Sequence, residues 1–306
     1  MNKPSNIILL GTGAIGSYYC GRLQQAGARI SAVCRSDYEI VKNKGISIKS
    51  IKGDFTFIPD ETVDDISKSS FCADYIVIAT KALPNIDLVS LIKPKVSNHT
   101  AIIIIQNGID NEIPLHKAFP DNEIISGIAF ICVTREEYGK VSHVDYGRLA
   151  IGNYPQGASE KTNYIAQLFN SVNVDCEVQD KILYARWRKL IWNIPYNSIS
   201  VLANKASTKD IMENENSTII VKRIMKEVAL IAESEGYSIN DEIIEKNLED
   251  TKKMPPYKTS MLLDFENNRP IEVEAIVGNA LRIAQKNSID VPLIQALYVM
   301  LSIINR

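Results

Sequence analysis

The sequence predicts an α/β domain followed by an all-α domain, and two observations carry this prediction. In the first half, apolar strand-like runs alternate with helical segments, which is the order that βαβ units require. From Asp180 onward, the chain reads as helices separated by short loops. Its 306 residues exceed what one typical core needs, so we expect domains spanning residues 1–179 and 180–306.

In the first half, strands are expected where short apolar runs end at turn residues. The runs 75–79 and 101–105 are apolar throughout, as is typical of parallel strands buried on both faces. Pro84 fits the first turn of a helix, and Tyr146-Gly147 fits a turn. The other expected strands are 7–10, 29–34, 46–51, 55–58 and 174–178 with a β-rich stretch over 123–152, and the expected helices are 14–26, 37–44 and 160–172.

The second half contains a series of helical patterns. Pro195 falls inside the first of them, where a missing N–H is expected to kink the helix. Met254-Pro255-Pro256 breaks the pattern and predicts a loop. The expected helices are 181–203, 218–236, 241–251, 273–286 and 292–304.

A glycine motif follows the first apolar run. The run Ile7–Leu10 leads directly into Gly11-Thr12-Gly13-Ala14-Ile15-Gly16. Here the first glycine permits a tight turn, the second lets a pyrophosphate approach the backbone, and the third lets the helix pack on the strand. The helix N-terminus would then face the phosphates. The alternative is an ordinary glycine turn in an α/β sheet.

The end of the second strand bears on the choice of dinucleotide. An NAD enzyme usually has an acid there, whereas this chain has Cys34-Arg35-Ser36. A guanidinium suits the 2′-phosphate of NADP, which it can grip with two donors. Asp37 is close enough to serve as the acid if the turn differs, and Arg35 could instead be a solvated surface charge.

Two further polar residues follow buried strands, at the sheet edge where parallel sheets bind ligands. Lys81 could reach a phosphate or ribose, or could be an exposed lysine at the start of a helix. Asn107 could face a ligand, or could form a simple turn with Gly108.

A row of polar side chains marks the first helix of the second half. Lys189, Asn193 and Asn197 are spaced i, i+4, i+8 and therefore share one face. Their neighbours are apolar, so the helix is expected to be buried and its polar groups to need partners. Such a stripe indicates either the wall of a binding site or a satisfied polar contact between domains.

Composition excludes several classes of function. With 34 basic and 36 acidic residues, the net charge of −2 points to no nucleic-acid or membrane partner. An odd number of cysteines without Cys-x-x-Cys, and only three histidines, argue against disulfides and a metal site. Reduced thiols favour a cytoplasmic protein. The cysteines are Cys20, Cys34, Cys72, Cys132 and Cys176.

Taken in order, these motifs resemble the ketopantoate reductase (2-dehydropantoate 2-reductase) family over nearly the full chain. The resemblance rests on the glycine motif, on Asn193 and Asn197, and on five further segments. These are Thr80-Lys81-Ala82, Gln106-Asn107-Gly108, Trp187-Arg188-Lys189-Leu190, Thr259-Ser260-Met261-Leu262-Leu263-Asp264 and Arg269-Pro270-Ile271-Glu272.

The resemblance implies a Rossmann domain followed by an all-helical domain like the C-terminal domain of 6-phosphogluconate dehydrogenase. It also implies an NADPH-dependent reduction of a small 2-oxo acid, foremost 2-dehydropantoate to (R)-pantoate in pantothenate biosynthesis. Lys189 would be the general acid, and we expect it to be charged at neutral pH because a lysine ordinarily titrates near about 10.4. Glu272 would orient it and contact the cofactor. Asn107, Asn193, Asn197 and Ser260 would bind substrate, and Asn107, Arg35, Lys81 and the glycine motif would contact NADP.

Two departures from the family pattern concern the substrate pocket, because the family has asparagines where this chain has Tyr257 and Ser207. Reduction of another branched or aromatic 2-oxo acid is therefore an alternative. An NAD-linked dehydrogenase of a 2-hydroxy acid and a non-catalytic NADPH sensor are further ones. The amphipathic C-terminal helices could support a homodimer.

Overall fold

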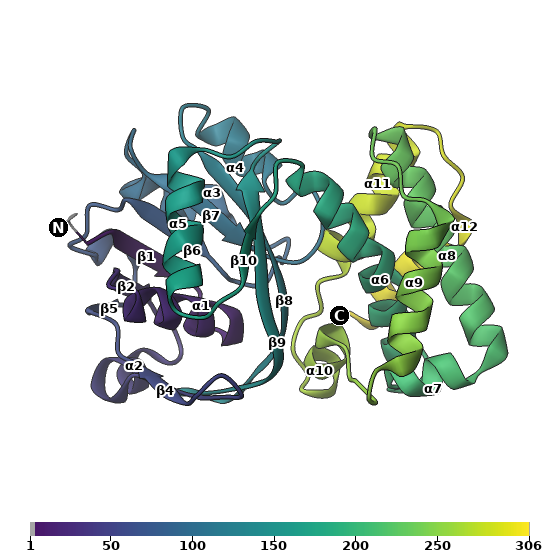
Figure 1. Ribbon diagram of the computed structural model, residues 1–306, viewed down its shortest axis with the longest axis horizontal. Coiled ribbons are helices and arrows are strands. Elements are labelled where there is room, and N and C mark those ends of the chain that lie inside the picture. Colours follow the sequence, from purple (N-terminus) through teal and green to yellow (C-terminus); the bar gives the residue numbers. More distant parts are fainter. Residues whose placement is uncertain (1–3, 306) are drawn as a thin grey trace. The chain divides into compact units, whose positions relative to one another are not determined.

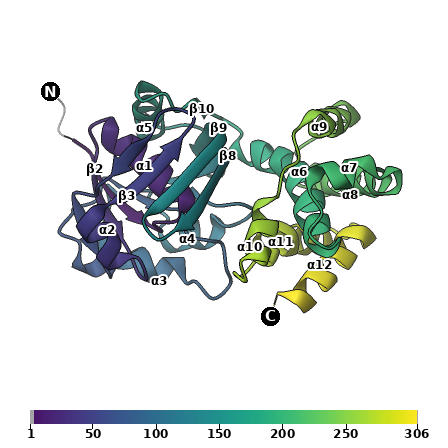
Figure 2. The ribbon, with the colours of Figure 1, turned by 90° about the horizontal axis from the view of Figure 1, so that it is seen from below.

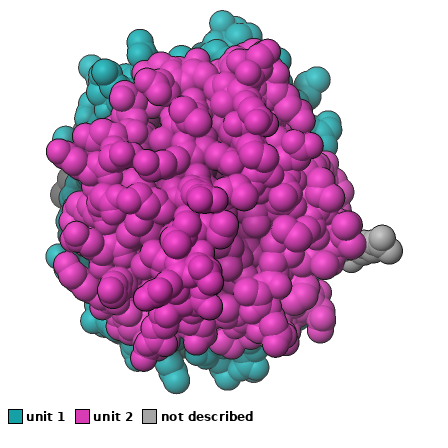
Figure 3. Space-filling view, turned by 90° about the vertical axis from the view of Figure 1, so that its right-hand side faces the viewer, with its two compact units in different colours: residues 1–81, 86–106, 111–182 teal, residues 82–85, 107–110, 183–306 magenta. Residues whose placement is uncertain are grey.

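The computed structural model describes residues 4–305, which form two compact units (Figures 1 and 3). Unit 1 comprises residues 1–81, 86–106 and 111–182, and unit 2 comprises residues 82–85, 107–110 and 183–306. Two short segments from the first half of the chain thus group with the C-terminal helices. The domain division at residues 179 and 180 stays a prediction.

Unit 1 is built on one ten-stranded sheet in the order β4-β3-β9-β8-β7-β6-β1-β2-β5, with β10 paired to β9. From β5 to β8 all pairs are parallel, whereas β8–β9 and β3–β4 are antiparallel. Every residue of β6 and β7 is buried, which confirms their prediction as internal parallel strands. The strands are β1 (Asn6–Leu10), β2 (Arg29–Val33), β3 (Ile46–Ser50), β4 (Phe55–Phe57), β5 (Glu61–Val63), β6 (Tyr75–Ile78), β7 (Ala101–Ile105), β8 (Ile124–Glu137), β9 (Lys140–Asn153) and β10 (Cys176–Val178).

Helices cover both faces of this sheet and create two apolar cores. Tyr18 and Tyr19 of α1 (Ala14–Gln25) and Phe169 of α5 (Glu160–Ser171) belong to one core. Ile92 of α3 (Leu88–Ile92) and Leu115 of α4 (Ile113–Ala118) belong to the other. The remaining helix, α2 (Tyr38–Lys44), follows β2. This doubly wound α/β arrangement confirms the predicted fold class of the first half.

Two local predictions for unit 1 are wrong. Pro84 does not begin a helix, since the next helix, α3, starts at Leu88 with Asp87 accepting the N–H of Ser90 as its cap. Tyr146 and Gly147 do not form a hairpin turn. They have positive φ values of 59° and 111° inside β9, where the pairing with β8 shifts register as in a β-bulge. Figure 2 shows β8 and β9 as two long neighbouring strands.

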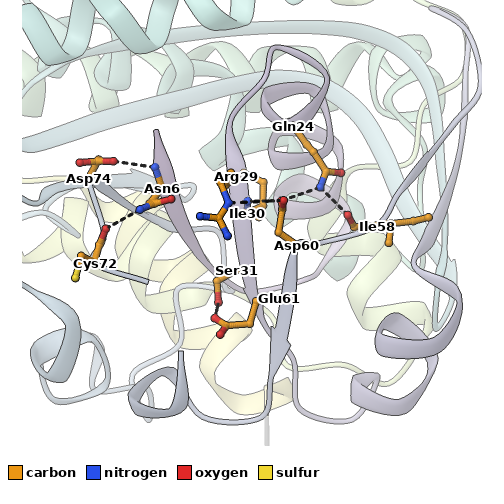
Figure 4. A network of polar contacts seen from close by, with 10 residues as sticks. All are labelled: Asn6, Gln24, Arg29, Ile30, Ser31, Ile58, Asp60, Glu61, Cys72 and Asp74. Carbon is orange, nitrogen blue, oxygen red and sulfur yellow. Dashed lines mark hydrogen bonds and ion pairs between the residues drawn. The ribbon is translucent and has the colours of Figure 1, made fainter. Parts of the chain in front are cut away.

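The β2–β5 edge of the sheet is held by polar side chains rather than by an apolar pattern (Figure 4). Asp60 accepts the backbone N–H of Ile30 at 2.9 Å. Glu61 accepts the hydroxyls of Ser31 at 2.5 Å and Ser69 at 2.6 Å, and the N–H of Ser70 at 2.9 Å. Burial alone raises the pKa of Glu61, but the hydrogen bonds from these serines outweigh it and lower the pKa to about 2.

We expect Glu61→Gln to make the stability of unit 1 less sensitive to acid. A carboxyl whose pKa is lowered by folding stabilises the protein above its ordinary pKa of 4.5, and this is lost as pH falls toward 2. At pH 7 the variant should lose about 1 kcal/mol, a figure that allows for solvent screening of a partly exposed group. Urea unfolding between pH 7 and 2.5 measures this. Glu233→Gln removes an exposed carboxylate and is the control. An unchanged pH slope in Glu61→Gln would contradict the assignment.

Unit 2 is helical, as predicted, around a single apolar core that includes Trp187, Val228 and Ile294. The long helix α6 (Ile182–Leu202) continues through Pro195 without a break in its assignment. A five-residue π-helical segment (Glu274–Gly278) precedes α11. The other helices are α7 (Thr208–Glu213), α8 (Glu215–Ser234), α9 (Asp241–Lys253), α10 (Ser260–Glu266), α11 (Asn279–Lys286) and α12 (Pro292–Ile304).

The last helix, α12, carries much of the exposed apolar surface of unit 2. Val299, Met300, Ile303 and Ile304 are 39–55% exposed. Formation of a homodimer stays a prediction. Among residues 4–305, no helix is both long and apolar enough to cross a bilayer.

Candidate functional site

The glycine motif of unit 1 has the geometry of a phosphate-binding loop. Gly11 has φ +107°, and a Cβ there would lie 2.7 Å from the backbone nitrogen of Thr80. A Cβ on Gly16 would lie 2.1 Å from the carbonyl oxygen of Gly11, so close helix packing requires this glycine. By contrast, nothing lies within 4 Å of a Cβ on Gly13, the N-cap of α1, which has no side-chain cap. The open space at uncapped N–H groups fits a dinucleotide pyrophosphate.

The residues after β2 separate the two possible cofactor contacts. Asp37 is 4% exposed, and its Oδ2 accepts the hydroxyl of Thr12 at 2.9 Å. The acid that could bond a ribose hydroxyl is therefore buried and already engaged inside the loop. Arg35 is exposed, and so is Lys81 at the end of the strand region that follows β6. This arrangement favours a basic contact over an acidic one.

In unit 2, Lys189 of α6 meets the loop that follows β7. Its Nζ donates to Oδ1 of Asn107 at 2.8 Å. The helix places Lys189 there because it occupies the only basic position of the row that continues with Asn193 and Asn197. The lysine and the amide, which sequence reasoning treated as separate candidates, are thus direct partners.

Protein atoms surround the Lys189 ammonium closely although the side chain is only half-buried by its surface. Burial lowers the pKa of Lys189 to about 7, the positive charge of Arg186 lowers it further, and Glu272 opposes the shift. The expectation that Lys189 is fully charged at neutral pH is therefore wrong. An amine that titrates near 7 can both donate and accept a proton under physiological conditions.

Glu272 ties the second short segment of unit 2 to the helices. Its side chain is 5% exposed, and Oε1 accepts the backbone N–H of Ala82 at 2.8 Å. It lies immediately before the helical turn that leads into the π-helical segment. Its negative charge acts on Lys189, so both residues predicted as catalytic belong to one electrostatic group.

Gly108 allows the Asn107 loop to approach the π-helical segment closely. It has φ +98°, and a Cβ would lie 2.1 Å from the carbonyl oxygen of Ala275. That oxygen accepts the N–H of Ile109 at 3.2 Å, and Nδ2 of Asn279 donates to the carbonyl of Ile109 at 2.6 Å. π-Helical turns are rare and often occur at functional sites. Here the turn provides the docking surface for the loop.

The remaining predicted substrate residues fall into two groups. The side chain of Asn193 is 5% exposed and has no hydrogen-bond partner among residues 4–305. Ser260 is partly exposed at the start of α10. Asn197, in contrast, is used internally. Its Oδ1 accepts the N–H of Met261 at 3.2 Å and its Nδ2 donates to the carbonyl of Asn193 at 2.9 Å, which braces α10 against α6.

The two positions that depart from the family pattern are linked through α7. Ser207 caps that helix and forms a reciprocal capping box with Asp210. The next residue, Thr208, exchanges two hydrogen bonds with the backbone of Tyr257. The ring of Tyr257 lies 6.3 Å from that of Trp192, measured between centroids. Ser207 therefore has a structural partner, and Tyr257 adds an aromatic surface beside the residue that precedes Asn193.

Sequence reasoning missed Arg186. This arginine is 2% exposed, and its Nη1 donates to the carbonyl oxygen of Gly108 at 3.0 Å. The only available signal was its place one helical turn before Lys189 on an otherwise apolar stretch. Among the described residues 4–305, no group of three or more His, Cys, Asp or Glu side chains is placed to hold a metal ion.

Comparisons with known proteins match the whole chain. The family models "Ketopantoate reductase PanE/ApbA" and "Ketopantoate reductase PanE/ApbA C terminal" match residues 7–156 and 181–305. A 2-dehydropantoate 2-reductase of Nostoc sp. is 38% identical, over 95% of this chain and 92% of that protein.

Solved structures agree. The crystal structure of 2-dehydropantoate 2-reductase from Methylococcus capsulatus is 42% identical, with a TM-score of 0.92, covering 97% of this chain and 96% of that chain. A ternary structure of D-mandelate dehydrogenase with NADH and anilino(oxo)acetate, 20% identical, shares the fold with a TM-score of 0.90, over 98% of each chain. Two consecutive family models and relatives above 30% identity thus account for both halves, and the chain belongs to the ketopantoate reductase family.

Proposed function

We propose that this chain catalyses the NADPH-dependent reduction of a 2-oxo acid, foremost 2-dehydropantoate to (R)-pantoate in pantothenate biosynthesis. The observation that carries the proposal is the contact of Lys189 with Asn107 beside the buried carboxylate of Glu272. A proton donor that titrates near neutral pH and a fixed amide are what reduction of a ketone requires. The matched family models and the relatives named 2-dehydropantoate 2-reductase support the choice of substrate.

When bound, NADPH supplies the hydride for the keto carbon of the substrate. As negative charge develops on the carbonyl oxygen, Lys189 stabilises that charge and donates its proton, so the product is a hydroxyl group. Asn107 holds the ammonium in place, and Glu272 favours its protonated form before transfer. Lys189 then regains a proton from solvent.

The substrate would be held by polar groups rather than by an arginine clamp. Asn193 has a buried carboxamide without a protein partner, and Ser260 offers a hydroxyl at the start of α10. Asn197 would act mainly through its brace on Met261, which positions the turn that carries Ser260. An unpartnered buried amide is costly on its own, so a bound ligand is a physical reason for Asn193.

Tyr257 supports a second candidate, the reduction of a bulkier branched or aromatic 2-oxo acid. Its ring forms an aromatic pair with Trp192, the neighbour of Asn193 on α6. A panel of 2-oxo acids, followed by NADPH oxidation at about 340 nm, tests both candidates. Preference for 2-dehydropantoate supports the proposal. Preference for a larger acid favours the second candidate, and binding of NADPH without any turnover points to a sensor.

We expect Arg35→Ala to weaken NADPH binding about 10–100-fold and to leave NADH binding nearly unchanged, because only NADPH carries the 2′-phosphate. The exposed guanidinium, together with the engaged state of Asp37, is the basis for this expectation. Titration of protein fluorescence with each dinucleotide measures both affinities. Lys44→Ala removes another exposed positive charge and serves as the control. An equal loss for NADPH and NADH would show that Arg35 does not read the phosphate.

A further inference from the structure

A buried arginine needs a physical explanation, because removing a guanidinium from water is expensive unless it is paired. Arg186 is 2% exposed in the core of unit 2. Its hydrogen bond to the carbonyl oxygen of Gly108 satisfies one of its five donors with a neutral acceptor. A shorter neutral side chain could fill such a position at lower cost, so the charge itself calls for a role.

The position of Arg186 links it to the lysine through one loop. Arg186 and Lys189 are one helical turn apart on α6, and they bind consecutive residues of the loop, Gly108 and Asn107. On its other side, the loop is bonded to the π-helical segment and α11 through Ile109. Asn107 is thus held in place between two elements that do not depend on a ligand.

The charges around Lys189 are unequal in direction. From its own helix, Arg186 presents a charge of the same sign, which favours the neutral amine. From the segment before the π-helical turn, Glu272 presents the opposite charge, which favours the ammonium. The guanidinium stays charged at every physiological pH, so its influence is permanent.

We propose that Arg186 is a positioning residue, which fixes the Asn107 carboxamide at Lys189 and whose permanent charge drives Lys189 to release its proton. The inference rests on the proposed function in taking Lys189 as the proton donor. It goes beyond that function by assigning the readiness of the donor to a residue that touches neither substrate nor cofactor.

The test is the pH dependence of Lys189 acylation by acetic anhydride, read by mass spectrometry of the labelled peptide, because only the neutral amine reacts. Arg186→Gln keeps a hydrogen-bond donor and removes the charge, and its midpoint should move up by about one pH unit. Arg186→Lys keeps a positive charge and should stay near wild type. Arg188→Gln, an exposed arginine on the same helix, should leave the midpoint unchanged. Arg186→Met, which leaves no buried donor unpaired, replaces the Gln variant if that one does not fold.

A second readout is the pH profile of kcat/KM for ketone reduction. Its basic limb should move up in Arg186→Gln together with the labelling midpoint, since reduction requires protonated Lys189. Lower activity with both midpoints unmoved would mean that Arg186 is only structural, and would overturn the inference. A labelling shift in a protein that reduces no 2-oxo acid would sustain the inference and reject the proposed function instead.

Discussion

Lys189→Ala is expected to lower the turnover of 2-oxo acid reduction by roughly 10²–10⁴-fold, the range for loss of a positioned general acid. The side chain is the one group of the described site with a pKa near 7 beside both an amide and a carboxylate. Without it, no proton donor of this kind meets the developing charge on the carbonyl oxygen. Steady-state NADPH oxidation with saturating substrate gives the change in kcat.

Two controls separate chemistry from folding. Lys286→Ala removes an exposed lysine from the last turn of α11 and should leave kcat unchanged. NADPH affinity of Lys189→Ala should remain close to that of the wild type, because the glycine loop belongs to unit 1. A Lys189→Ala protein that turns over at nearly the wild-type rate would remove Lys189 from the mechanism.

Gly108→Ala is expected to cost about 2–5 kcal/mol of stability in unit 2, from overpacking together with a left-handed backbone. The new methyl group would lie 2.1 Å from the carbonyl oxygen of Ala275, a backbone atom that cannot rotate away. Relief requires the loop to leave the π-helical segment, which breaks the bond between Ile109 and Ala275 and displaces Asn107. Activity should therefore fall with stability.

A matched glycine isolates the effect of the close contact. Gly236 also has a positive φ, +86°, but nothing lies within 4 Å of a Cβ there. Gly236→Ala should cost only about 1–2 kcal/mol, the strain of the left-handed backbone alone. Urea unfolding of both variants, with kcat measured on the folded fraction, makes the comparison. Equal destabilisation would mean that the loop does not depend on its contact with Ala275.

The order of elements could be predicted where burial leaves a pattern in the sequence. The fully apolar strands β6 and β7 and the long amphipathic helices α8 and α9 are examples. β5 was missed because three residues carry no periodicity and its edge is held by side chains such as Asp60 and Glu61. The short helices α7 and α10 were missed for the same reason, since their ends are set by caps at Ser207 and Thr259.

The candidate site was predictable as a set of residues but not as a set of partners. Spacing placed Lys189 on one face with Asn193 and Asn197, yet it could not show that Asn197 braces α10. No local pattern links Lys189 to Asn107, because 82 residues separate them. The lowered pKa of the lysine depends on packing around it, which no spacing encodes.

Segments 82–85 and 107–110 make unit 2 discontinuous in sequence, and this limits its modularity. A chimera that exchanges only residues 183–306 between relatives would retain Lys189 but pair it with the Asn107 loop of another protein. The fit of that loop against α6 and the π-helical turn would then have to be compatible by inheritance rather than by design. We therefore regard the helical half and these two short segments as one recombination unit, whose parts are expected to change together among relatives.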